Sequence, residues 1–200
     1  MNFAVFASGH GGNLQAIINA VKNKKIRADL KLVFSDKSGA FALQRAEKAG
    51  IPALCLNPKD YASREDFDRA VLARLKEHRI DFIALAGYMR LLSGHFIRQY
   101  SGRILNVHPA LLPAFKGTRG IRDAFDYGVK VTGVTVHFVT GEMDAGAIVA
   151  QEAFKVGPKD TLESLERKIH ALEHRFYPKA IDLFVRGKLK TAGRKVIVLR

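Results

Sequence analysis

The sequence lacks most of what a secreted, membrane-spanning or zinc-binding protein needs. It has one cysteine, Cys55, in 200 residues, so no internal disulfide can form and a reducing cytoplasm is the expected compartment. No apolar run approaches the ~20 residues that cross a bilayer. The N-terminus enters an apolar strand at once, without the basic region and cleavage site of a signal peptide. No Cys/His cluster has zinc spacing, so we expect no metal site.

Acidic residues are scarce beside basic ones, with 19 Asp and Glu against 33 Lys and Arg and a formal net charge of +14. Such an excess suits an acidic partner, either nucleic acid or a multiply anionic substrate. The basic residues are scattered, however, and the chain has neither an arginine–glycine repeat nor the interleaved aromatics of an RNA-binding strand. We therefore do not expect nucleic-acid binding as the main function.

Short apolar runs alternate with amphipathic stretches, which predicts an α/β fold with a mainly parallel, twisted sheet and helices on both faces. The length fits one domain, expected over residues 1–190, followed by a short basic tail, 191–200. The N-terminal half is Rossmann-like. Strands are expected at 3–7, 30–34, 53–56, 82–86, around 106–108, and at 131–140, 147–156 and 196–199. Helices are expected at 13–24, 41–48, 64–78, 95–100, 122–127 and 162–186, the last bending at Pro178.

A glycine-rich turn, SGHGGN from Ser8 to Asn13, joins the first strand to the first helix. Glycines let the backbone approach an anion, and the N-terminus of a helix attracts phosphate. Leu14 replaces the third glycine of a dinucleotide fingerprint, and the Lys-Ser/Thr ending of a nucleoside-triphosphate loop is missing. The turn therefore suits one phosphate on a small molecule, although a plain tight turn explains the glycines equally well.

Two polar residues, Asn106 and His108, stand two apart in an otherwise apolar strand. Alternate residues of a strand point to one face, so both side chains leave the sheet in the same direction. An amide donor beside an imidazole can form an oxyanion site with a proton donor. A single histidine in a strand is more often a satisfied core residue, so the pair gains weight only from its surroundings.

Five ordered motifs make the chain resemble the 10-formyltetrahydrofolate-dependent formyltransferases, and among them the phosphoribosylglycinamide formyltransferases, small single-domain folate enzymes of purine synthesis. The resemblance covers nearly all of residues 1–190 and implies the single-domain formyltransferase fold, with a phosphate- and nucleotide-binding N-terminal half and a folate-binding, catalytic C-terminal half. The motifs are SGHGGNLQ (8–15), LAGYMR (85–90), NVHP (106–109), DAG (144–146), and EH (173–174) followed by YP (177–178).

The resemblance implies formyl transfer from the co-substrate 10-formyltetrahydrofolate to the amine of glycinamide ribonucleotide, a step of de novo purine (IMP) biosynthesis. Asn106 and protonated His108 would stabilise the negative oxygen that develops. Asp144 would raise the proton affinity of His108, orient it, and help move a proton from the amine to the folate nitrogen through water. An opposite charge within a few ångströms does favour an imidazolium. Taken alone, Asp144 is an ordinary turn residue.

The same resemblance implies two binding regions. Gly11, Gly12 and Asn13 would contact the nucleotide phosphate, and Glu173 its ribose or glycinamide end. Without the resemblance, Glu173 is one more charge on a helix face, and several of the folate candidates are core residues. The folate is expected along Met89, Arg90, Leu91, Leu92, Ile97, Thr140, Gly141, Glu142 and Met143, with Arg64 near its glutamate tail.

Four positions depart from the usual family pattern while the three catalytic candidates stay intact. Gly12 stands where serine is common, and Ala110 replaces a frequent serine. Ile121 lies in a segment that often carries histidines. His170 stands where glutamine is frequent. These departures concern the nucleotide contacts.

Three other functions compete with this one. Formyltetrahydrofolate deformylases use a similar Asn/His/Asp trio with water as acceptor, but usually carry an N-terminal regulatory domain, whereas this chain begins at the first strand. Methionyl-tRNA formyltransferases normally add a C-terminal barrel, for which the tail after Arg186 is too short. A non-catalytic binding protein of the same fold is the third. We expect glycinamide ribonucleotide and a reduced folate as partners, no membrane, and a monomer or homodimer.

Overall fold

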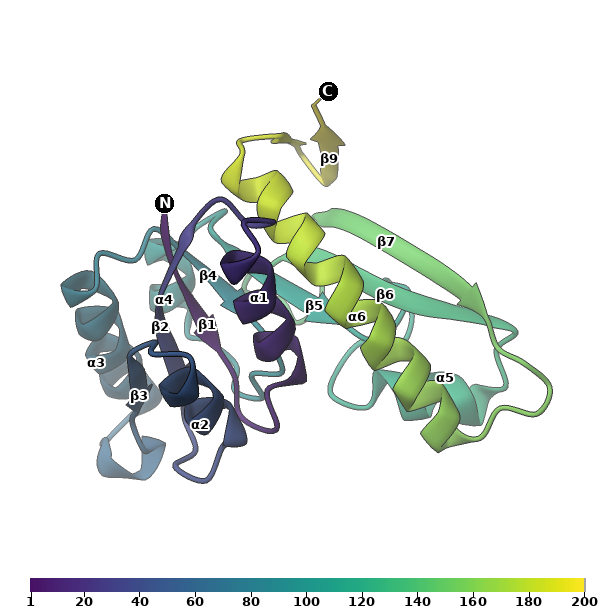
Figure 1. Ribbon diagram of the computed structural model, residues 1–200, viewed down its shortest axis with the longest axis horizontal. Helices are drawn as coiled ribbons and strands as arrows, with labels where there is room; N and C mark the ends of the chain where they lie inside the picture. Colours follow the sequence, from purple (N-terminus) through teal and green to yellow (C-terminus); the bar gives the residue numbers. More distant parts are fainter. Residues whose placement is uncertain (200) are drawn as a thin grey trace.

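The fold is a single nine-stranded sheet covered by helices on both faces (Figure 1). The structure is a computed structural model and describes residues 1–199. The strand order is β3-β2-β1-β4-β5-β6-β7-β9-β8. Neighbouring strands run parallel from β3 to β5. The predicted α/β class with a mainly parallel sheet and helices on both faces is confirmed.

The elements match the predicted order. The strands are β1 (Asn2–Phe6), β2 (Asp29–Ser35), β3 (Ala53–Cys55), β4 (Phe82–Leu85), β5 (Ile104–His108), β6 (Val131–Phe138), β7 (Ile148–Lys155), β8 (Leu189–Ala192) and β9 (Lys195–Val198). The helices are α1 (Gly12–Lys22), α2 (Phe41–Lys48), α3 (Arg64–Glu77), α4 (Gly94–Gln99), α5 (Gly120–Tyr127) and α6 (Leu162–Val185), with one 3-10 turn at Pro58–Asp60.

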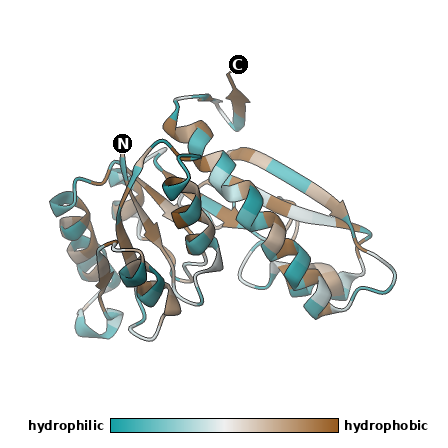
Figure 2. Ribbon diagram, in the orientation of Figure 1, coloured by the Kyte–Doolittle hydropathy of each residue, from teal (hydrophilic) through white to brown (hydrophobic). Residues whose placement is uncertain are grey.

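The parallel strands are apolar because both of their faces are buried. On β1, Phe3 and Val5 belong to the core cluster under α1 and α6, whereas Ala4 and Phe6 belong to the cluster under α3 and α4. All four side chains are fully buried. Figure 2 shows these strands as hydrophobic and the outer sides of the helices as hydrophilic. Covered strands of this kind read as near-continuous apolar runs in a sequence.

The C-terminal strands are antiparallel, except where β7 pairs with β9. β7 alternates between buried or half-buried and exposed residues, because one of its faces meets solvent. The hairpin β8–β9 joins the sheet through one register pair, Ile148 with Lys195. We predicted one strand in this tail, near 196–199. β8 was missed because its exposed residues, such as Lys190 and Thr191, carry no apolar pattern.

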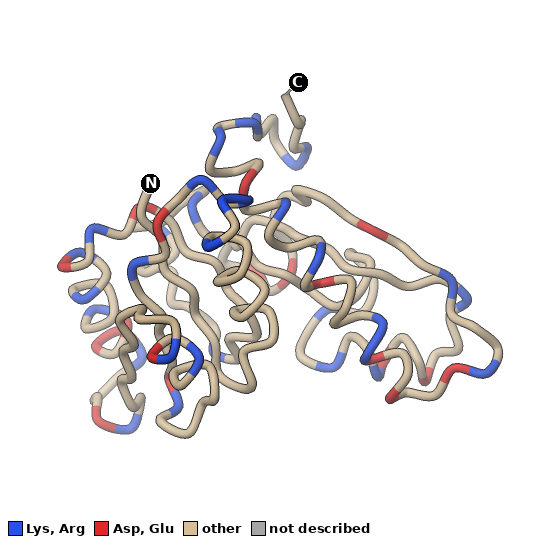
Figure 3. The backbone as a smooth tube through the Cα atoms, viewed as in Figure 1, with Lys and Arg blue, Asp and Glu red and all other residues tan. Residues whose placement is uncertain are grey.

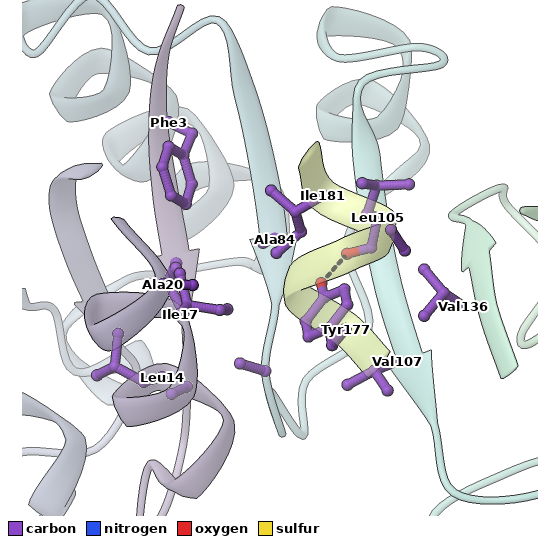
Figure 4. Packing of buried hydrophobic residues seen from close by; sticks show 14 of the residues in the cluster. Phe3, Leu14, Ile17, Ala20, Ala84, Leu105, Val107, Val136, Tyr177 and Ile181 are labelled. Carbon is purple, nitrogen blue, oxygen red and sulfur yellow. Dashed lines mark hydrogen bonds between the residues drawn. The ribbon is translucent and has the colours of Figure 1, made fainter. Parts of the chain in front are cut away.

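The longest helix, α6, crosses the sheet in front of β5 in the view of Figure 1. It begins with a capping box in which Thr161 and Ser164 exchange hydrogen bonds with each other's backbone. It then continues through Pro178 to Val185 as one helix. The buried hydroxyl of Tyr177 donates a hydrogen bond of 3.0 Å to the carbonyl of Leu105 (Figure 4). This contact fixes α6 against the strand that carries Asn106 and His108.

The strand order also tells where a ligand crevice should lie. β1 is followed by α1 on one face of the sheet, and β4 leads to α4 on the other. The connections therefore diverge between the neighbouring strands β1 and β4. Open α/β sheets bind ligands outside the carboxyl ends of the strands at such a switch point. Asn106, His108 and the glycine-rich turn all lie at this edge.

The excess of positive charge is not gathered in one element. Figure 3 shows Lys and Arg on both halves of the molecule. Several of them pair with acids one turn away, as Arg69 does with Asp66 and Arg74 with Glu77. Within residues 1–199, no helix combines the length and apolar character that crossing a bilayer requires.

Candidate active site

Four polar side chains share one face of the sheet where β5 meets β6. The antiparallel register sets Asn106 opposite His137 and His108 opposite Thr135. Leu105 and Val107, between them on β5, point into the core under α6. Because side chains alternate along a strand, the polar set faces the other way. Asn106, His108 and His137 line a cavity there, whereas the Thr135 hydroxyl bonds to the backbone of Ala110 and Leu112. His108 and His137 are 3% and 2% exposed, so both rings are held by their surroundings.

Asp144 reaches this face from the loop between β6 and β7. Its backbone is in the left-handed region, with φ of 50°, which is uncommon for a residue with a side chain. Nearby, Gly146 passes so close to β6 that a Cβ would lie 1.7 Å from the carbonyl oxygen of Phe138. The backbone N–H of Gly117 donates a 2.8 Å hydrogen bond to Asp144 Oδ2. The DAG motif therefore has a local reason: the loop must turn sharply to bring the carboxylate inward.

The three predicted catalytic residues, Asn106, His108 and Asp144, lie close together, and His137 links Asn106 to Asp144. Asp144 Oδ2 lies 3.5 Å from Nδ1 of His108, and its Oδ1 lies 3.5 Å from Nε2 of His137. Nε2 of His137 is in turn 3.1 Å from Nδ2 of Asn106. Sequence reasoning missed His137 as a site residue. The signal available was its place in an apolar strand, two residues from Thr135, in the pattern that singled out Asn106 and His108.

The hydrogen bonds of His137 decide what it does. Its Nδ1 lies 2.9 Å from the carbonyl oxygen of Phe138, which can only accept, so the ring hydrogen sits on Nδ1. In the neutral ring, Nε2 then accepts a hydrogen bond from the amide of Asn106. A protonated ring would instead donate from Nε2 to Asp144. Neutral His137 therefore orients the amide of Asn106 by accepting one N–H of its Nδ2. The second N–H of the same nitrogen stays available to a ligand in the cavity.

Burial and charge act in opposite directions on His108. Burial lowers the pKa of His108 below its ordinary value, more strongly than Asp144 and the Phe115 carbonyl raise it. Nε2 lies 2.8 Å from that carbonyl and Nδ1 faces Asp144, so only an imidazolium would donate to both. We expected Asp144 to hold His108 protonated. Asp144 does act in that direction, but the net shift is the opposite because the ring is desolvated.

Asp144 itself is held as a carboxylate. Burial favours its neutral form, but contacts with His137, the Gly117 N–H and His108 outweigh this and keep the pKa of Asp144 below its usual value. A carboxylate here attracts positive charge onto the ring beside it. The pair is therefore set to hold a proton when negative charge develops in the cavity.

The cavity in front of these residues has a volume of about 350 Å³. Its walls include the apolar side chains of Leu85, Leu92, Ile97 and Val139. Every residue predicted to contact folate lines it, together with the three catalytic candidates and two of the four nucleotide candidates. The folate candidates in the lining are Arg64, Met89, Arg90, Leu91, Leu92, Ile97, Thr140, Gly141, Glu142 and Met143.

The nucleotide candidates are split between two cavities. Asn13 and Glu173 line the first, where Asn13 Nδ2 donates a 3.0 Å hydrogen bond to Glu173 Oε2. Gly12 lies instead on a neighbouring groove of about 890 Å³ between α1 and α6. A Cβ on Gly12 would stand 2.7 Å from Nε2 of His174, so a serine here would require the imidazole to move. Gly11, in the left-handed region with φ of 75°, precedes α1 as its N-cap.

Comparison with known proteins agrees with this geometry. A family model described as "Formyl transferase" matches residues 1–181 of the chain. The chain belongs to the formyl transferase family. The family to which the sequence motifs pointed is therefore confirmed.

Relatives of this formyl transferase extend the finding. The phosphoribosylglycinamide formyltransferase of Bacillus subtilis is 45% identical over 90% of this chain and 92% of its own length. The crystal structure of glycinamide ribonucleotide transformylase 1 from Symbiobacterium toebii is 46% identical, with a TM-score of 0.98, over 100% of this chain and 94% of that one. The trifunctional purine biosynthetic protein adenosine-3 of Gallus gallus is 46% identical, and the match spans 94% of this chain but only 19% of that protein.

Two arginines stand at the rim of the formyl transferase cavity. Arg64 donates a hydrogen bond to the carbonyl of Leu92, and the guanidinium of Arg90 lies 4.9 Å from the ring centre of Phe67. Met89 and Leu91, on the same loop, are 60% and 58% exposed. Across residues 1–199, no three His, Cys, Asp or Glu side chains are grouped so that they could hold a metal ion.

Proposed function

We propose that the protein transfers the formyl group of 10-formyltetrahydrofolate to the amine of glycinamide ribonucleotide, giving formylglycinamide ribonucleotide and tetrahydrofolate. The observation that carries this proposal is the meeting of Asn106, His108 and Asp144 on one wall of a cavity in a formyl transferase. The cavity has an apolar stretch with cations at its rim, and a polar end formed by Asn13 and Glu173. Relatives named for this reaction match nearly the whole chain.

The residues at the folate end fit a flat heteroaromatic ring with a carboxylate tail. Leu85, Leu92 and Ile97 offer apolar surface to the ring faces, and small-molecule sites combine such walls with a few polar groups that fix orientation. The backbone of the turn from Thr140 to Met143 can read the ring edge. Arg64 and Arg90 are suited to the carboxylates, because a guanidinium matches that group geometrically.

Catalysis needs a place for negative charge and a route for one proton. The nucleotide amine bonds to the formyl carbon, the bond from that carbon to the folate nitrogen breaks, and the proton that the amine loses goes to the folate nitrogen. Asn106 donates its free N–H to the formyl oxygen while that oxygen is negative. A donor aimed at such an oxygen is worth roughly 3 kcal/mol.

His108 and Asp144 are expected to stabilise the negative oxygen further and to help transfer the proton. As the formyl oxygen becomes negative, we expect it to compete with the Phe115 carbonyl for the Nε2 hydrogen of His108, whose ring stays in place. His108 takes its extra proton from solvent before the reaction and keeps it throughout, so it uses none of the protons that pass from the amine to the folate nitrogen. The charge on Asp144 favours this imidazolium, against the effect of burial. Asp144 then holds the water through which the proton passes from the amine to the folate nitrogen.

The test is formyl transfer followed spectroscopically, with and without glycinamide ribonucleotide. We expect tetrahydrofolate to be released only when the nucleotide is present. Equal release without the nucleotide would assign a deformylase, with water as acceptor. No release in either case, from folded protein and active donor, would assign a binding protein of the same fold.

Three expectations about context belong to this proposal. We propose a reducing cytoplasm as the compartment, on the ground of the single cysteine. The partners are the nucleotide and the reduced folate, and nucleic acid is not among them. The assembly is a monomer or a homodimer.

A further inference from the structure

The loop that carries Asp144 is held at one end by β6. The backbone N–H of Phe138 donates a 3.0 Å hydrogen bond to the carbonyl of Ala147, and the buried Gly146 lies against the Phe138 carbonyl. Asp144 itself has a backbone φ of 50°, and a residue with a side chain keeps such a conformation only where its surroundings fix it. The contacts with Phe138 hold the loop from Gly146 onward, so the backbone at Asp144 and Ala145 needs support from elsewhere.

A residue of the C-terminal hairpin gives this support. Nη2 of Arg194 donates a 3.2 Å hydrogen bond to the carbonyl of Ala145, the residue directly after Asp144. Arg194 stands in the two-residue turn between β8 and β9, behind Gly193, whose φ of 59° allows the chain to turn tightly. Arg194 is not among the residues that line the cavity. It therefore acts on the backbone beside the catalytic carboxylate from outside the cavity.

The hairpin presents Arg194 from a fixed frame. Leu189 of β8 and Val196 of β9 are partly buried and pack against the core under α6. Lys195, the neighbour of Arg194, pairs with Ile148, the first residue of β7. Because β7 begins directly after the loop that carries Asp144, this pairing brings the hairpin turn beside that loop.

We propose that Arg194 is a positioning residue for Asp144. By holding the Ala145 carbonyl, it keeps the Asp144 carboxylate facing both His108 and His137. This inference rests on the proposed function, which gives Asp144 its catalytic role. The match to the formyl transferase family ends at residue 181, so the hairpin lies outside the segment by which the family is recognised.

The distances around Asp144 show why its position matters. Its two oxygens lie 3.5 Å from Nδ1 of His108 and 3.5 Å from Nε2 of His137, so a small outward movement would break both contacts. A displacement of about 1 Å at a catalytic group can lower a rate by about a hundredfold. The N–H of Gly117 still holds the Asp144 side chain when Arg194 is lost. We therefore expect a smaller loss, about three- to tenfold in kcat, the equivalent of one hydrogen bond.

The experiment is steady-state formyl transfer by Arg194→Ala and Arg194→Lys, with circular dichroism and thermal melting to check the fold. The matched control is Lys190→Ala, which removes a cation from an exposed position of the same hairpin. Arg194→Ala should lower kcat by about three- to tenfold and leave KM for both substrates unchanged. Arg194→Lys keeps a charged donor and should recover part of the rate. Lys190→Ala should turn over like wild type.

A double-mutant cycle with Asp144→Asn separates positioning of the carboxylate from a general structural role. If Arg194 acts through the Asp144 charge, Arg194→Ala should lower kcat no further in the Asp144→Asn protein. The same fold-loss in both backgrounds would overturn the inference, and so would unchanged kcat or a rise in KM alone in Arg194→Ala. A wild-type protein that transfers no formyl group would contradict the proposed function instead.

Discussion

The two halves of the sheet are built on different rules, and the site lies where they meet. From β3 to β5 the strands are parallel and, apart from the edge strand β3, have buried residues on both faces, so they supply stiffness and few polar groups. From β6 onward they are mostly antiparallel, and their outer strands are largely exposed. β5 belongs to both halves: Val107 faces the core under α6, while Asn106 and His108 face the cavity. The comparison shows that the reactive side chains lie on β5, a strand that packs against α6 on one face and borders the cavity on the other.

The largest expected effect comes from substituting the catalytic candidates where the two halves of the sheet meet. His108→Ala removes the ring, and Asp144→Asn removes the charge that favours its protonation. Each should lower kcat by about a hundredfold to a thousandfold, the range seen when an oxyanion donor is lost. Steady-state kinetics measures the loss, and circular dichroism with thermal melting checks that the variants stay folded.

A matched control for this prediction is His78→Ala, which deletes the same ring from the half-buried C-cap of α3, outside the cavity, and should turn over normally. Near-normal turnover by both His108→Ala and Asp144→Asn would contradict the assigned chemistry. Loss of folding in either would require Asp144→Glu and His108→Asn to be compared instead.

The next effect sharpens the contrast in stability between the two halves. Leu105→Ala, at a fully buried residue of β5, should lower the free energy of unfolding by about 2–5 kcal/mol through the lost transfer energy and the cavity left behind. Ile197→Ala, on the hairpin strand β9 and 51% exposed, should change it by less than about 0.5 kcal/mol. Chemical denaturation measures both. Equal losses would mean that the hairpin is part of the cooperative core.

A smaller effect tests the residue that β6 adds to the site. His137→Ala leaves the amide of Asn106 without the nitrogen that orients it, so kcat should fall by about tenfold, the equivalent of one hydrogen bond. KM should hardly change for either substrate. His137→Gln restores an acceptor in that region and should recover part of the rate. If His137→Ala raised KM and left kcat alone, the residue would be a binding residue instead.

The smallest effect lies at the rim on the parallel side. Arg64 stands in the first turn of α3, after the N-cap Ser63, and lines the folate end of the cavity. Arg64→Ala should raise KM by a few-fold for polyglutamylated folate and less for the monoglutamate, because exposed ion pairs contribute little. The measurement is KM of wild type and Arg64→Ala for the polyglutamylated and the monoglutamate formyl donors. An equal rise of KM for both folates would show that Arg64 does not contact the polyglutamate tail.

The sequence predicted most of the parallel half because strands buried on both faces leave unbroken apolar runs, as 82–86 does. The start of α3 has a local cause: the side chain of Ser63 accepts the backbone N–H of Asp66, and serine is a favoured N-cap residue. The hairpin strand β8 was not predicted, because an exposed strand has no burial pattern. The downward direction of the His108 pKa could not be predicted either, since it depends on how much solvent the fold removes. His137 showed the same pattern as Asn106 and His108, a polar residue in an apolar strand, but its partner Asn106 is known only from the register of β6 against β5.

The most direct test of the account follows the formyl carbon itself. The protein is given 10-formyltetrahydrofolate labelled with carbon-13 in the formyl group, together with glycinamide ribonucleotide, and the products are read by NMR. We predict that the label appears as a formamide carbon on the nucleotide, and that this signal is lost with Asp144→Asn. Label in free formate, at the same rate with or without nucleotide, would contradict the central claim that this site directs the formyl group to an amine.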